Sequence, residues 1–397
     1  MSFECVYFKR KKTQDLTEAL QQGVSSLLFG PLGSGKTTLL KHLEDLNTLG
    51  KPLHYDLQSP SVRSQIEADP TLIFREMESR KQKGPALLLA DEIQKVPAIL
   101  EVLRWLIDEK LAVVVATASS ARKIKTAGLH KLAGRVRFES LSPLSWGETG
   151  FTTSRLEEIL RYGTLAGVLR EKDLSQRERT LADYPHQYLE EEVRREGAVR
   201  QVFRFEKFLR LAALESGSAP NLSKMGEEVG VSHTSIREYF QILEDSLLIH
   251  RLPAFGSKDD PVLRTSKCYF FDMGIRNAAA RLGHSEDLLR LERERLFEHF
   301  IVLELISELP SGARLSFWAP KRGDGVDLVV EQKNRVVALD IRATDQPLPR
   351  DFRGLAAFCK RYSPQEAYLV CEAPAIKKVG EFTALPWMEL RSKVLGP

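Results

Sequence analysis

Eight residues near the start of the chain, Gly30 to Thr37, have the types and spacing of a phosphate-binding loop. They fit the pattern Gly-x-x-x-x-Gly-Lys-(Ser/Thr), in which backbone N–H groups face phosphates, the lysine reaches the outer phosphates and the hydroxyl holds magnesium. An apolar strand candidate, Ser25–Phe29, leads directly into the loop. The residues expected to bind ATP are Gly30, Gly33, Ser34, Gly35, Lys36, Thr37 and Thr38, with Thr37 on Mg²⁺.

Hydrolysis of ATP also requires a carboxylate that holds the metal and a group that activates water. The apolar run Ala86–Ala90 is typical of a strand buried in a parallel sheet, and it ends in Asp91 and Glu92. We expect Asp91 to hold Mg²⁺ through water and Glu92 to orient the attacking water. The alternative is an acidic pair that opens the next helix.

A further apolar run, Leu111–Thr117, ends in polar residues at the same edge of the predicted sheet. Thr117 and Ser119 are both candidates to contact the γ-phosphate or the attacking water, and the pattern does not choose between them. Arg122 and Arg135 follow. Either is a candidate arginine finger for a neighbouring subunit, and the alternative for each is a solvated surface arginine.

These motifs together resemble a prokaryotic AAA+ ATPase family whose members join the ATPase domain to a nuclease-like C-terminal domain. The stretches that carry the resemblance are Gly30–Thr38, Leu88–Pro97, Thr117–Lys123 and Leu132–Arg135. The resemblance implies Walker A, Walker B and sensor roles for Lys36, Thr37, Asp91, Glu92 and Ser119. It also implies Arg135 as a candidate for the finger. Because a finger in trans requires a neighbouring subunit, we expect a ring, and by the resemblance six is the commonest number of subunits.

Carboxylates form a second pattern in the last third of the chain. Glu298 lies on the apolar stripe of a helix predicted over 291–309, and strand periodicity places Asp340 and Arg342 on one face, with Asp327 on the preceding strand. The order helix, three strands, helix, strand resembles the PD-(D/E)xK nuclease core, which implies Glu298, Asp327 and Asp340 as metal ligands.

Arg342 stands where that nuclease pattern has lysine. An arginine side chain is not deprotonated in proteins, so Arg342 cannot accept a proton from water. We therefore expect a degenerate domain that is kept for its shape or for contact with the DNA backbone. An active nuclease and a purely structural role are the alternatives.

Between these two patterns the chain is predicted to be helical. Residues 154–210 are expected to form a helical lid, and 221–252 read as helix, glycine turn, helix and wing strand, with Ser223 and Ser232 as N-caps and Gly230 in the turn. This order is typical of a winged helix-turn-helix. A DNA reader would present His233, Thr234, Ser235 and Arg237 to the major groove.

Charge argues against specific DNA reading by that segment. Residues 151–260 carry 16 Lys and Arg against 19 Asp and Glu, and a basic face is what the DNA backbone requires. Packing within the protein is therefore the favoured interpretation of the winged helix.

Length and composition limit the remaining possibilities. The 397 residues suggest several domains, and 43% hydrophobic with 28% charged residues is a globular composition. Cys5, Cys268, Cys359 and Cys371 are widely spaced and form no CxxC motif, so we expect reduced thiols. With no apolar run long enough to cross a membrane and no secretory signal pattern at the start, we expect a cytoplasmic protein without a membrane partner.

The sequence thus predicts an α/β protein with a P-loop AAA+ domain over 1–150, a helical lid with a winged helix-turn-helix over 151–260, and a nuclease-like domain over 261–397. We expect it to bind and hydrolyse ATP with Mg²⁺ and to act on DNA, branched or broken structures included. One alternative is a regulatory ATPase that binds protein partners, and another is an active ATP-dependent nuclease.

Overall fold

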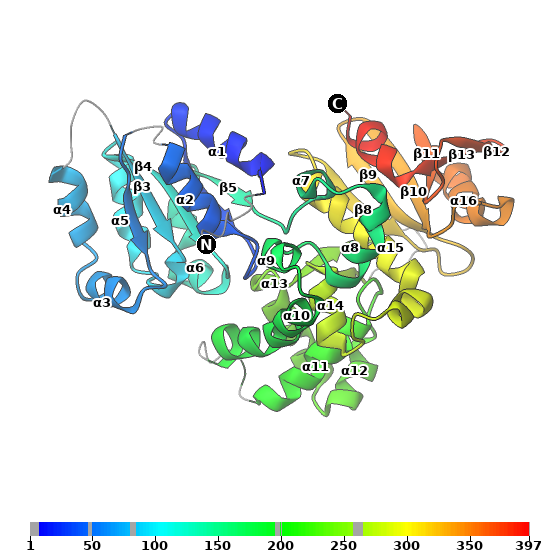
Figure 1. Ribbon diagram of the computed structural model, residues 1–397, viewed down its shortest axis with the longest axis horizontal. Helices are drawn as coiled ribbons and strands as arrows, with labels where there is room; N and C mark the ends of the chain where they lie inside the picture. Colours follow the sequence, from blue (N-terminus) through cyan, green and yellow to red (C-terminus); the bar gives the residue numbers. More distant parts are fainter. Residues whose placement is uncertain are drawn as a thin grey trace. The chain divides into compact units, whose positions relative to one another are not determined.

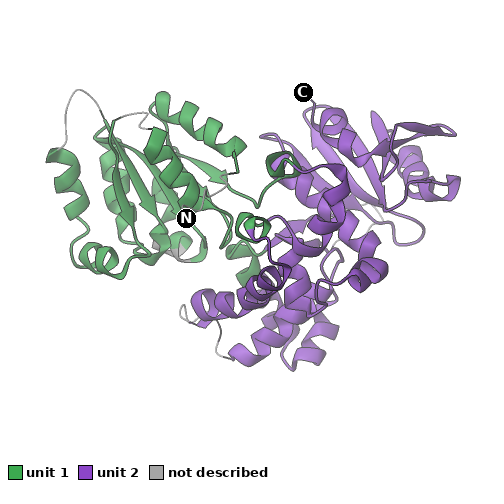
Figure 2. Cartoon of the chain, viewed as in Figure 1, with its two compact units in different colours: residues 1–150, 165–170, 241–248 green, residues 151–164, 171–240, 249–397 purple. Residues whose placement is uncertain are grey.

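The computed structural model describes residues 8–46, 50–79, 85–194, 199, 201–256 and 265–396. Cys5 lies outside the described residues. The chain divides into two compact units, coloured separately in Figure 2. Unit 1 contains residues 1–150, 165–170 and 241–248, and unit 2 contains the rest. The division into three domains at 150 and 260 stays a prediction.

Unit 1 is built on a parallel sheet of five strands (Figure 1). Its strands are β1 (Ser25–Phe29), β2 (Leu53–Asp56), β3 (Ala86–Asp91), β4 (Ala112–Ala118) and β5 (Val136–Ser140). Their order is β2-β3-β4-β1-β5, and every neighbouring pair is parallel. The predicted parallel α/β sheet is confirmed.

Helices cover both faces of this sheet because its central strands are apolar on both sides. All seven residues of β4 are buried. Along β3, Leu87 and Leu89 pack with one core cluster, and Leu88 and Ala90 pack with the other. The helices are α1 (Lys11–Gln21), α2 (Lys36–Leu46), α3 (Pro60–Ala68), α4 (Leu72–Ser79), α5 (Ile99–Asp108), α6 (Arg122–Ala127) and α7 (Trp146–Thr149).

Two later segments complete unit 1. One contains α9 (Ala166–Arg170), and the other, residues 241–248, includes the end of α13 (His233–Asp245). Asp245 is bonded twice to the region of α6: its carbonyl oxygen accepts from Ala121 N–H at 2.9 Å, and its carboxylate lies 2.6 Å from Lys125 Nζ. Unit 1 is therefore assembled from three separate stretches of chain.

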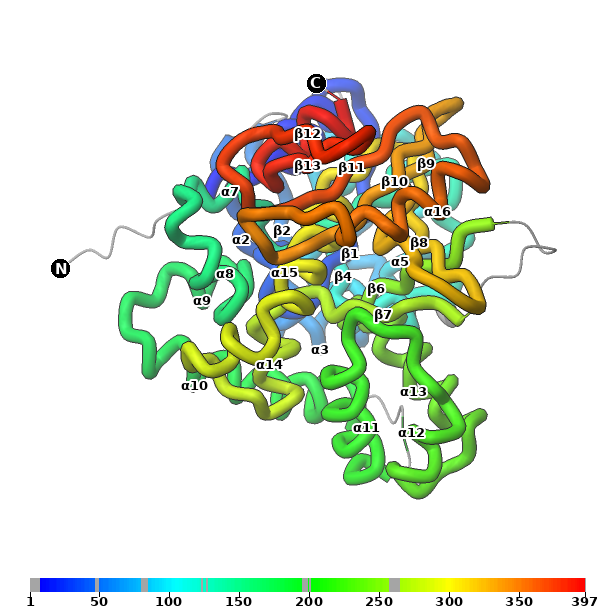
Figure 3. Tube along the Cα trace, turned by 90° about the vertical axis from the view of Figure 1, so that its right-hand side faces the viewer, coloured from blue at the N-terminus to red at the C-terminus, as the bar shows by residue number. Residues whose placement is uncertain are grey.

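The first half of unit 2 is mainly helical. It contains α8 (Leu156–Tyr162), α10 (Leu174–Tyr188), α11 (Val202–Leu214), α12 (Leu222–Val229), most of α13, α14 (Met273–Ala280), and the antiparallel pair β6 (Ile249–Leu252) and β7 (Lys267–Phe270), which run side by side in Figure 3. The predicted order of helix, turn, helix and strand is present. Its assignment as a winged helix stays a prediction.

One predicted helix cap in this region is wrong. The side chain of Asn221, rather than Ser223, caps α12 by accepting from Lys224 N–H at 3.1 Å. Asn221 is the better placed because its backbone is extended just before the first helical residue, which is the N-cap geometry. Ser232 caps α13 as predicted, through Ser235 N–H at 3.1 Å. Gly230 takes the left-handed turn conformation, with φ 82°.

The second half of unit 2 is a six-stranded sheet with two main helices. Its strands are β8 (Arg314–Trp318), β9 (Val326–Gln332), β10 (Arg335–Arg342), β11 (Glu366–Cys371), β12 (Lys377–Val379) and β13 (Phe382–Pro386). Their order is β12-β13-β11-β10-β9-β8. The helix α15 (Glu286–Glu308) begins earlier than predicted because Ser285 and two acidic residues provide a starting turn, and α16 (Arg353–Tyr362) follows β10.

Candidate nucleotide site

The loop between β1 and α2 has the tightly curled backbone conformation that its glycines predict. Gly33 and Gly35 have φ of 80° and 98°, a left-handed conformation that side chains disfavour. A Cβ on Gly30 would lie 2.6 Å from the carbonyl oxygen of Leu141 and from Ser34 Oγ. These three glycines therefore fix the loop against the end of β1, and Lys36 begins the helix behind it.

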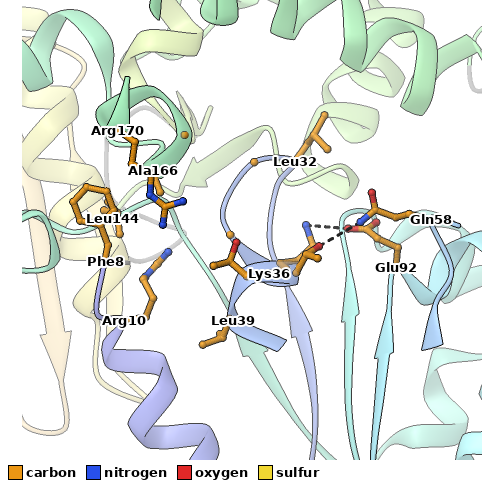
Figure 4. A pocket seen from close by; sticks show the side chains of 15 residues that line it. Phe8, Arg10, Leu32, Lys36, Leu39, Gln58, Glu92, Leu144, Ala166 and Arg170 are labelled. Carbon is orange, nitrogen blue, oxygen red and sulfur yellow. Dashed lines mark hydrogen bonds and ion pairs between the residues drawn. The ribbon is translucent and has the colours of Figure 1, made fainter. Parts of the chain in front are cut away.

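A pocket of about 310 Å³ opens over this loop (Figure 4). The predicted residues that line it are Gly33, Gly35, Lys36, Thr37, Thr38 and Glu92. Ser34 and Asp91 are buried and do not line the pocket. The loop and Glu92 thus line one pocket in unit 1.

Thr37 and Asp91 place two oxygen ligands side by side. The Thr37 hydroxyl donates to Asp91 Oδ2 at 2.6 Å, and the Thr117 hydroxyl donates to the other carboxylate oxygen. Gln58 Nε2 also approaches Thr37 Oγ1 at 3.3 Å. Hydroxyl and carboxylate oxygens are the donors that Mg²⁺ prefers, so these residues fit the predicted metal role.

Glu92 is turned toward a different set of partners. Its backbone is left-handed, with φ 58°, just after the strand. Ser119 Oγ donates to Glu92 Oε2 at 2.7 Å, Lys36 Nζ lies 3.2 Å from Glu92 Oε1, and Gln94 donates to the same carboxylate. Thr117 and Ser119, equivalent candidates in the sequence, therefore serve different carboxylates.

Electrostatics keeps Glu92 ionised. Burial acts to raise the pKa of its carboxyl, but the positive charge of Lys36 and the hydrogen bonds from Ser119 and Gln94 outweigh burial, and the net pKa is lowered. Lys36 also donates to the carbonyl oxygens of Gly30 at 2.9 Å and Pro31 at 3.2 Å. The ammonium group is thus held at the floor of the loop beside the carboxylate.

Sequence reasoning missed three residues at this site. Arg10 lines the pocket, donates to Ser34 O at 3.0 Å and pairs with Glu148 at 3.1 Å. Arg170, the last residue of α9, lines the same side of the pocket (Figure 4), and Gln94 bridges Glu92 and Ser119. Two of these residues could have been found in the sequence. Arg10 belongs to a run of basic residues, and Gln94 closes the Asp-Glu-Ile-Gln stretch.

The two candidate finger arginines lie outside the pocket of their own chain. Arg135 Nε lies 2.6 Å from Asp108 Oδ1, on the surface of unit 1. Arg122 begins α6, close after Ser119. A role for either residue at a neighbouring subunit stays a prediction.

In unit 2 the structure brings together the carboxylates that the nuclease resemblance selected. Arg342 Nη1 lies 3.2 Å from Asp327 Oδ2 and 3.0 Å from Asp340 Oδ1. A residue that the sequence did not indicate, Lys267, lies 2.8 Å from Glu298 Oε1 and 3.7 Å from Asp327 Oδ1. Within the described ranges, no group of three or more His, Cys, Asp or Glu side chains is arranged to hold a metal ion.

The pKa values of this cluster follow from burial and close charges. Burial and the neighbouring Asp327 charge raise the pKa of Asp340 to about 9 and also raise that of Glu298. Burial alone would raise the pKa of Asp327, but Lys267 and Arg342 lower it. For Lys267, burial acts to lower the pKa and the two carboxylates more than compensate, so its pKa is raised.

A separate basic cleft of about 650 Å³ lies between β8 and α16. Its lining includes Trp318, Lys321, Arg322, Lys360 and Arg361. The four basic residues are exposed, and Trp318 is buried, with no hydrogen-bond partner for its indole Nε1 among the described residues. The cleft therefore carries four exposed basic side chains around a buried tryptophan.

The start of α13 presents part of the set predicted for DNA reading. His233, Thr234 and Arg237 are exposed, whereas Ser235 is partly buried and bonded to the cap Ser232. Over the described parts of the chain, no helix is long and apolar enough to cross a membrane.

Comparison with known protein families divides the chain into three matched segments. Residues 24–150 match an AAA domain, 153–286 match a domain of unknown function (DUF8612), and 293–390 match a second domain of unknown function (DUF4143). The chain therefore joins an AAA domain to a C-terminal domain of unknown function. No curated protein matches the chain.

Several solved structures share low similarity with the chain. The ORC1 protein of Aeropyrum pernix, solved in complex with DNA, is 17% identical over 70% of this chain and 93% of its own, with a TM-score of 0.30. The replication initiator DnaA, bound to AMPPCP and single-stranded DNA, is 12% identical over 60% and 89%, with a TM-score of 0.31. PCH-2 of C. elegans is 11% identical over 62% and 71%, with a TM-score of 0.27.

Proposed function

We propose that unit 1 binds ATP with Mg²⁺ in the pocket over the glycine loop and hydrolyses it. The observation that carries this proposal is the pairing of two separate oxygen sets: Thr37 with Asp91, and Ser119 with Glu92. The first set suits a metal ion and the second suits a water-activating carboxylate. Metal-bound phosphate and an oriented water are the two requirements of phosphoryl transfer to water.

Each residue has a distinct task in this proposal. The loop N–H groups and Lys36 bind the outer phosphates, and Thr37 and Asp91 hold Mg²⁺, which neutralises phosphate charge when bound. Glu92, ionised and fixed by Ser119, takes the proton from the attacking water. Arg10 and Arg170 add positive charge on the other side of the pocket.

The direct test compares two variants of the full chain. Lys36→Ala should abolish tight ATP binding because the phosphates lose their cation. Glu92→Gln should bind ATP and lose about 10²–10⁴-fold in turnover, the usual contribution of a general base. Equilibrium binding of a fluorescent ATP analogue and steady-state phosphate release separate the two effects. Normal turnover by Glu92→Gln would remove Glu92 from the catalytic assignment.

We further propose that the protein acts on DNA, with the basic cleft of Lys321, Arg322, Lys360 and Arg361 as its contact with the phosphate backbone. Four exposed cations around one hollow favour a polyanion, whose binding releases counterions. Branched and broken DNA are included among the substrates to be tested. The measurement is ATPase rate and binding with single-stranded, duplex and branched DNA.

The competing function is a regulatory ATPase that binds protein partners. The observation that favours it is the acidic character of 151–260, which makes α13 a poor match for DNA. DNA affinity that falls steeply with salt would support the first function, and absence of DNA binding would favour the second. Assembly into a ring, six subunits included, follows from the proposed trans role of Arg135 and is tested by sedimentation with and without ATP.

A further inference from the structure

We propose that the ammonium group of Lys267 takes the place of a metal ion between Glu298 and Asp327, so that the native cluster binds no divalent cation. This inference goes beyond ATP hydrolysis and does not depend on it. It concerns Glu298, Asp327 and Asp340, the three carboxylates that the nuclease resemblance assigns to a metal.

Lys267 reaches the cluster from outside the six-stranded sheet. It lies at the start of β7, which pairs with β6, whereas Asp327 and Asp340 lie on β9 and β10. Residues two apart on a strand share a face, and the next such residue, Tyr269, donates its hydroxyl to Glu298 Oε1 at 2.6 Å. Two side chains of β7, Lys267 and Tyr269, therefore donate hydrogen bonds to the carboxylate of Glu298.

The cations of the cluster are interleaved with its carboxylates. Lys267 lies between Glu298 and Asp327, at 2.8 and 3.7 Å, and Arg342 lies between Asp327 and Asp340, at 3.2 and 3.0 Å. Each neighbouring pair of carboxylates thus already shares a positive charge. Two cations a few ångströms apart repel each other strongly in a buried site, so a metal ion would have to displace Lys267.

The carboxylate oxygens are also largely committed to hydrogen bonds. Asp327 Oδ2 accepts from Ile341 N–H at 3.0 Å in addition to Arg342, and Glu298 Oε1 accepts from both Lys267 and Tyr269. Asp340 Oδ2 is buried and has no hydrogen-bond partner within the described part of the chain. Mg²⁺ takes one or two carboxylates and keeps several waters, and the carboxylates that it would need here already hold Lys267 and Arg342.

This arrangement gives Lys267 a stabilising role that a metal would otherwise have. The positive charge is carried by the chain, so the cluster holds together in the absence of metal. Removing the ammonium group should leave two partly buried carboxylates facing each other across the space that it filled. The inference therefore predicts that Glu298 and Asp327 bind a divalent cation only when Lys267 is replaced.

The test uses the full chain without nucleotide and with Mn²⁺ as the probe. Free Mn²⁺ is counted by electron paramagnetic resonance, and thermal unfolding is followed in parallel. Wild-type protein should bind no Mn²⁺ that Glu298→Gln removes, and should show no rise in Tm with Mn²⁺ that depends on Glu298. Lys267→Met, which keeps the aliphatic stem, should bind one Mn²⁺ at least about tenfold more tightly. Lys267→Met/Asp327→Asn should lose that site again.

Lys377→Met is the matched control, because Lys377 is an exposed lysine of the same unit, and it should behave like wild type. Circular dichroism shows whether each variant is folded. Tight binding of one Mn²⁺ by the wild type that Glu298→Gln removes would overturn the inference, and this arm does not require the lysine variant to fold. A folded Lys267→Met protein that gains no site would overturn it as well.

Discussion

Ser119 holds Glu92: its hydroxyl donates to Glu92 Oε2 at 2.7 Å, while the neighbouring candidate Thr117 donates instead to Asp91. Two polar residues at the end of one strand therefore act on two different carboxylates. The distinction has a kinetic consequence, because one carboxylate is proposed to orient water and the other to hold metal.

We expect Ser119→Ala to reduce turnover by about 10–100-fold with little change in ATP affinity, because Glu92 loses one of the bonds that orient it and positioning errors act on kcat. Thr117→Val should instead raise the Mg²⁺ concentration needed for half-maximal rate, because Asp91 loses one of its two hydroxyl donors. Steady-state rates across a Mg²⁺ titration distinguish the two variants. Identical profiles for both would refute the division of roles.

Mixing two inactive variants tests a finger in trans. Arg135→Ala should lose about 10³–10⁵-fold in turnover if it acts as an arginine finger. Equimolar Arg135→Ala and Lys36→Ala should then regain part of the activity, since mixed interfaces combine an intact pocket with an intact arginine. The same experiment applies to Arg122.

Arg104→Ala is the control for the Arg135 experiment. Like Arg135, Arg104 pairs with Asp108, at 3.2 Å, but it should retain turnover because it lies on α5 without a proposed role. Equal loss of activity in both variants would point to the shared Asp108 contact as a structural requirement. No rescue at concentrations where both proteins assemble would count against a trans finger.

The basic cleft is expected to determine the salt dependence of DNA binding. Replacing Lys321, Arg322, Lys360 and Arg361 by alanine should weaken binding and reduce the slope of log affinity against log salt by about 0.9 for each DNA phosphate that the variant no longer neutralises. Lys377→Ala/Lys378→Ala, exposed on β12, is the control and should change little. An unchanged slope in the cleft variant would place the binding surface elsewhere.

Arg342 provides a second comparison for the same binding experiment. If the cluster of Glu298, Asp327 and Asp340 itself contacted DNA, Arg342→Ala should weaken binding as well. Arg342 is not part of the cleft lining and is engaged with Asp327 and Asp340, so we expect a smaller effect on DNA affinity than from the cleft residues. We also expect negligible DNA cleavage with Mg²⁺ or Mn²⁺, measured on linear and branched substrates.

Acid sensitivity should depend partly on His284. Burial lowers the pKa of this imidazole, whose Nε2 lies 3.3 Å from Gly274 O. The unfolded chain therefore binds a proton below about pH 6.5 that the folded chain does not, so stability falls as pH decreases through this range. His284→Gln should show a smaller fall in Tm between about pH 7.5 and about pH 5.5, whereas His130→Gln, at an exposed position, should follow the wild type.

Local patterns predicted the parts of the site that one stretch of chain can encode. Lys36, Thr37 and the Asp91–Glu92 pair belong to short motifs next to apolar strands, so both their chemistry and their position follow from the sequence. Arg170 has no such motif. It reaches the pocket because α9 returns to unit 1 after the chain has entered unit 2.

Lys267 was missed for a related reason. It is a single lysine at the start of a strand, and its partners lie on a helix and another strand that follow later in the chain. Strand periodicity could place Asp340 and Arg342 on the same face of β10. It could not predict that a side chain from β7, a strand of another sheet, would lie beside Asp327. Only tertiary packing places the amine between the carboxylates.

The three separate stretches of chain that form unit 1 limit how this unit can be exchanged between proteins. A recombination event that exchanged only residues 1–150 would separate the pocket from Arg170 and the α6 region from Asp245. A new carboxyl-terminal partner would have to supply equivalents of both segments. Residues 1–150 are therefore not an independent module, and changes at residues 165–170 and 241–248 should be correlated with changes in the first 150 residues across related chains.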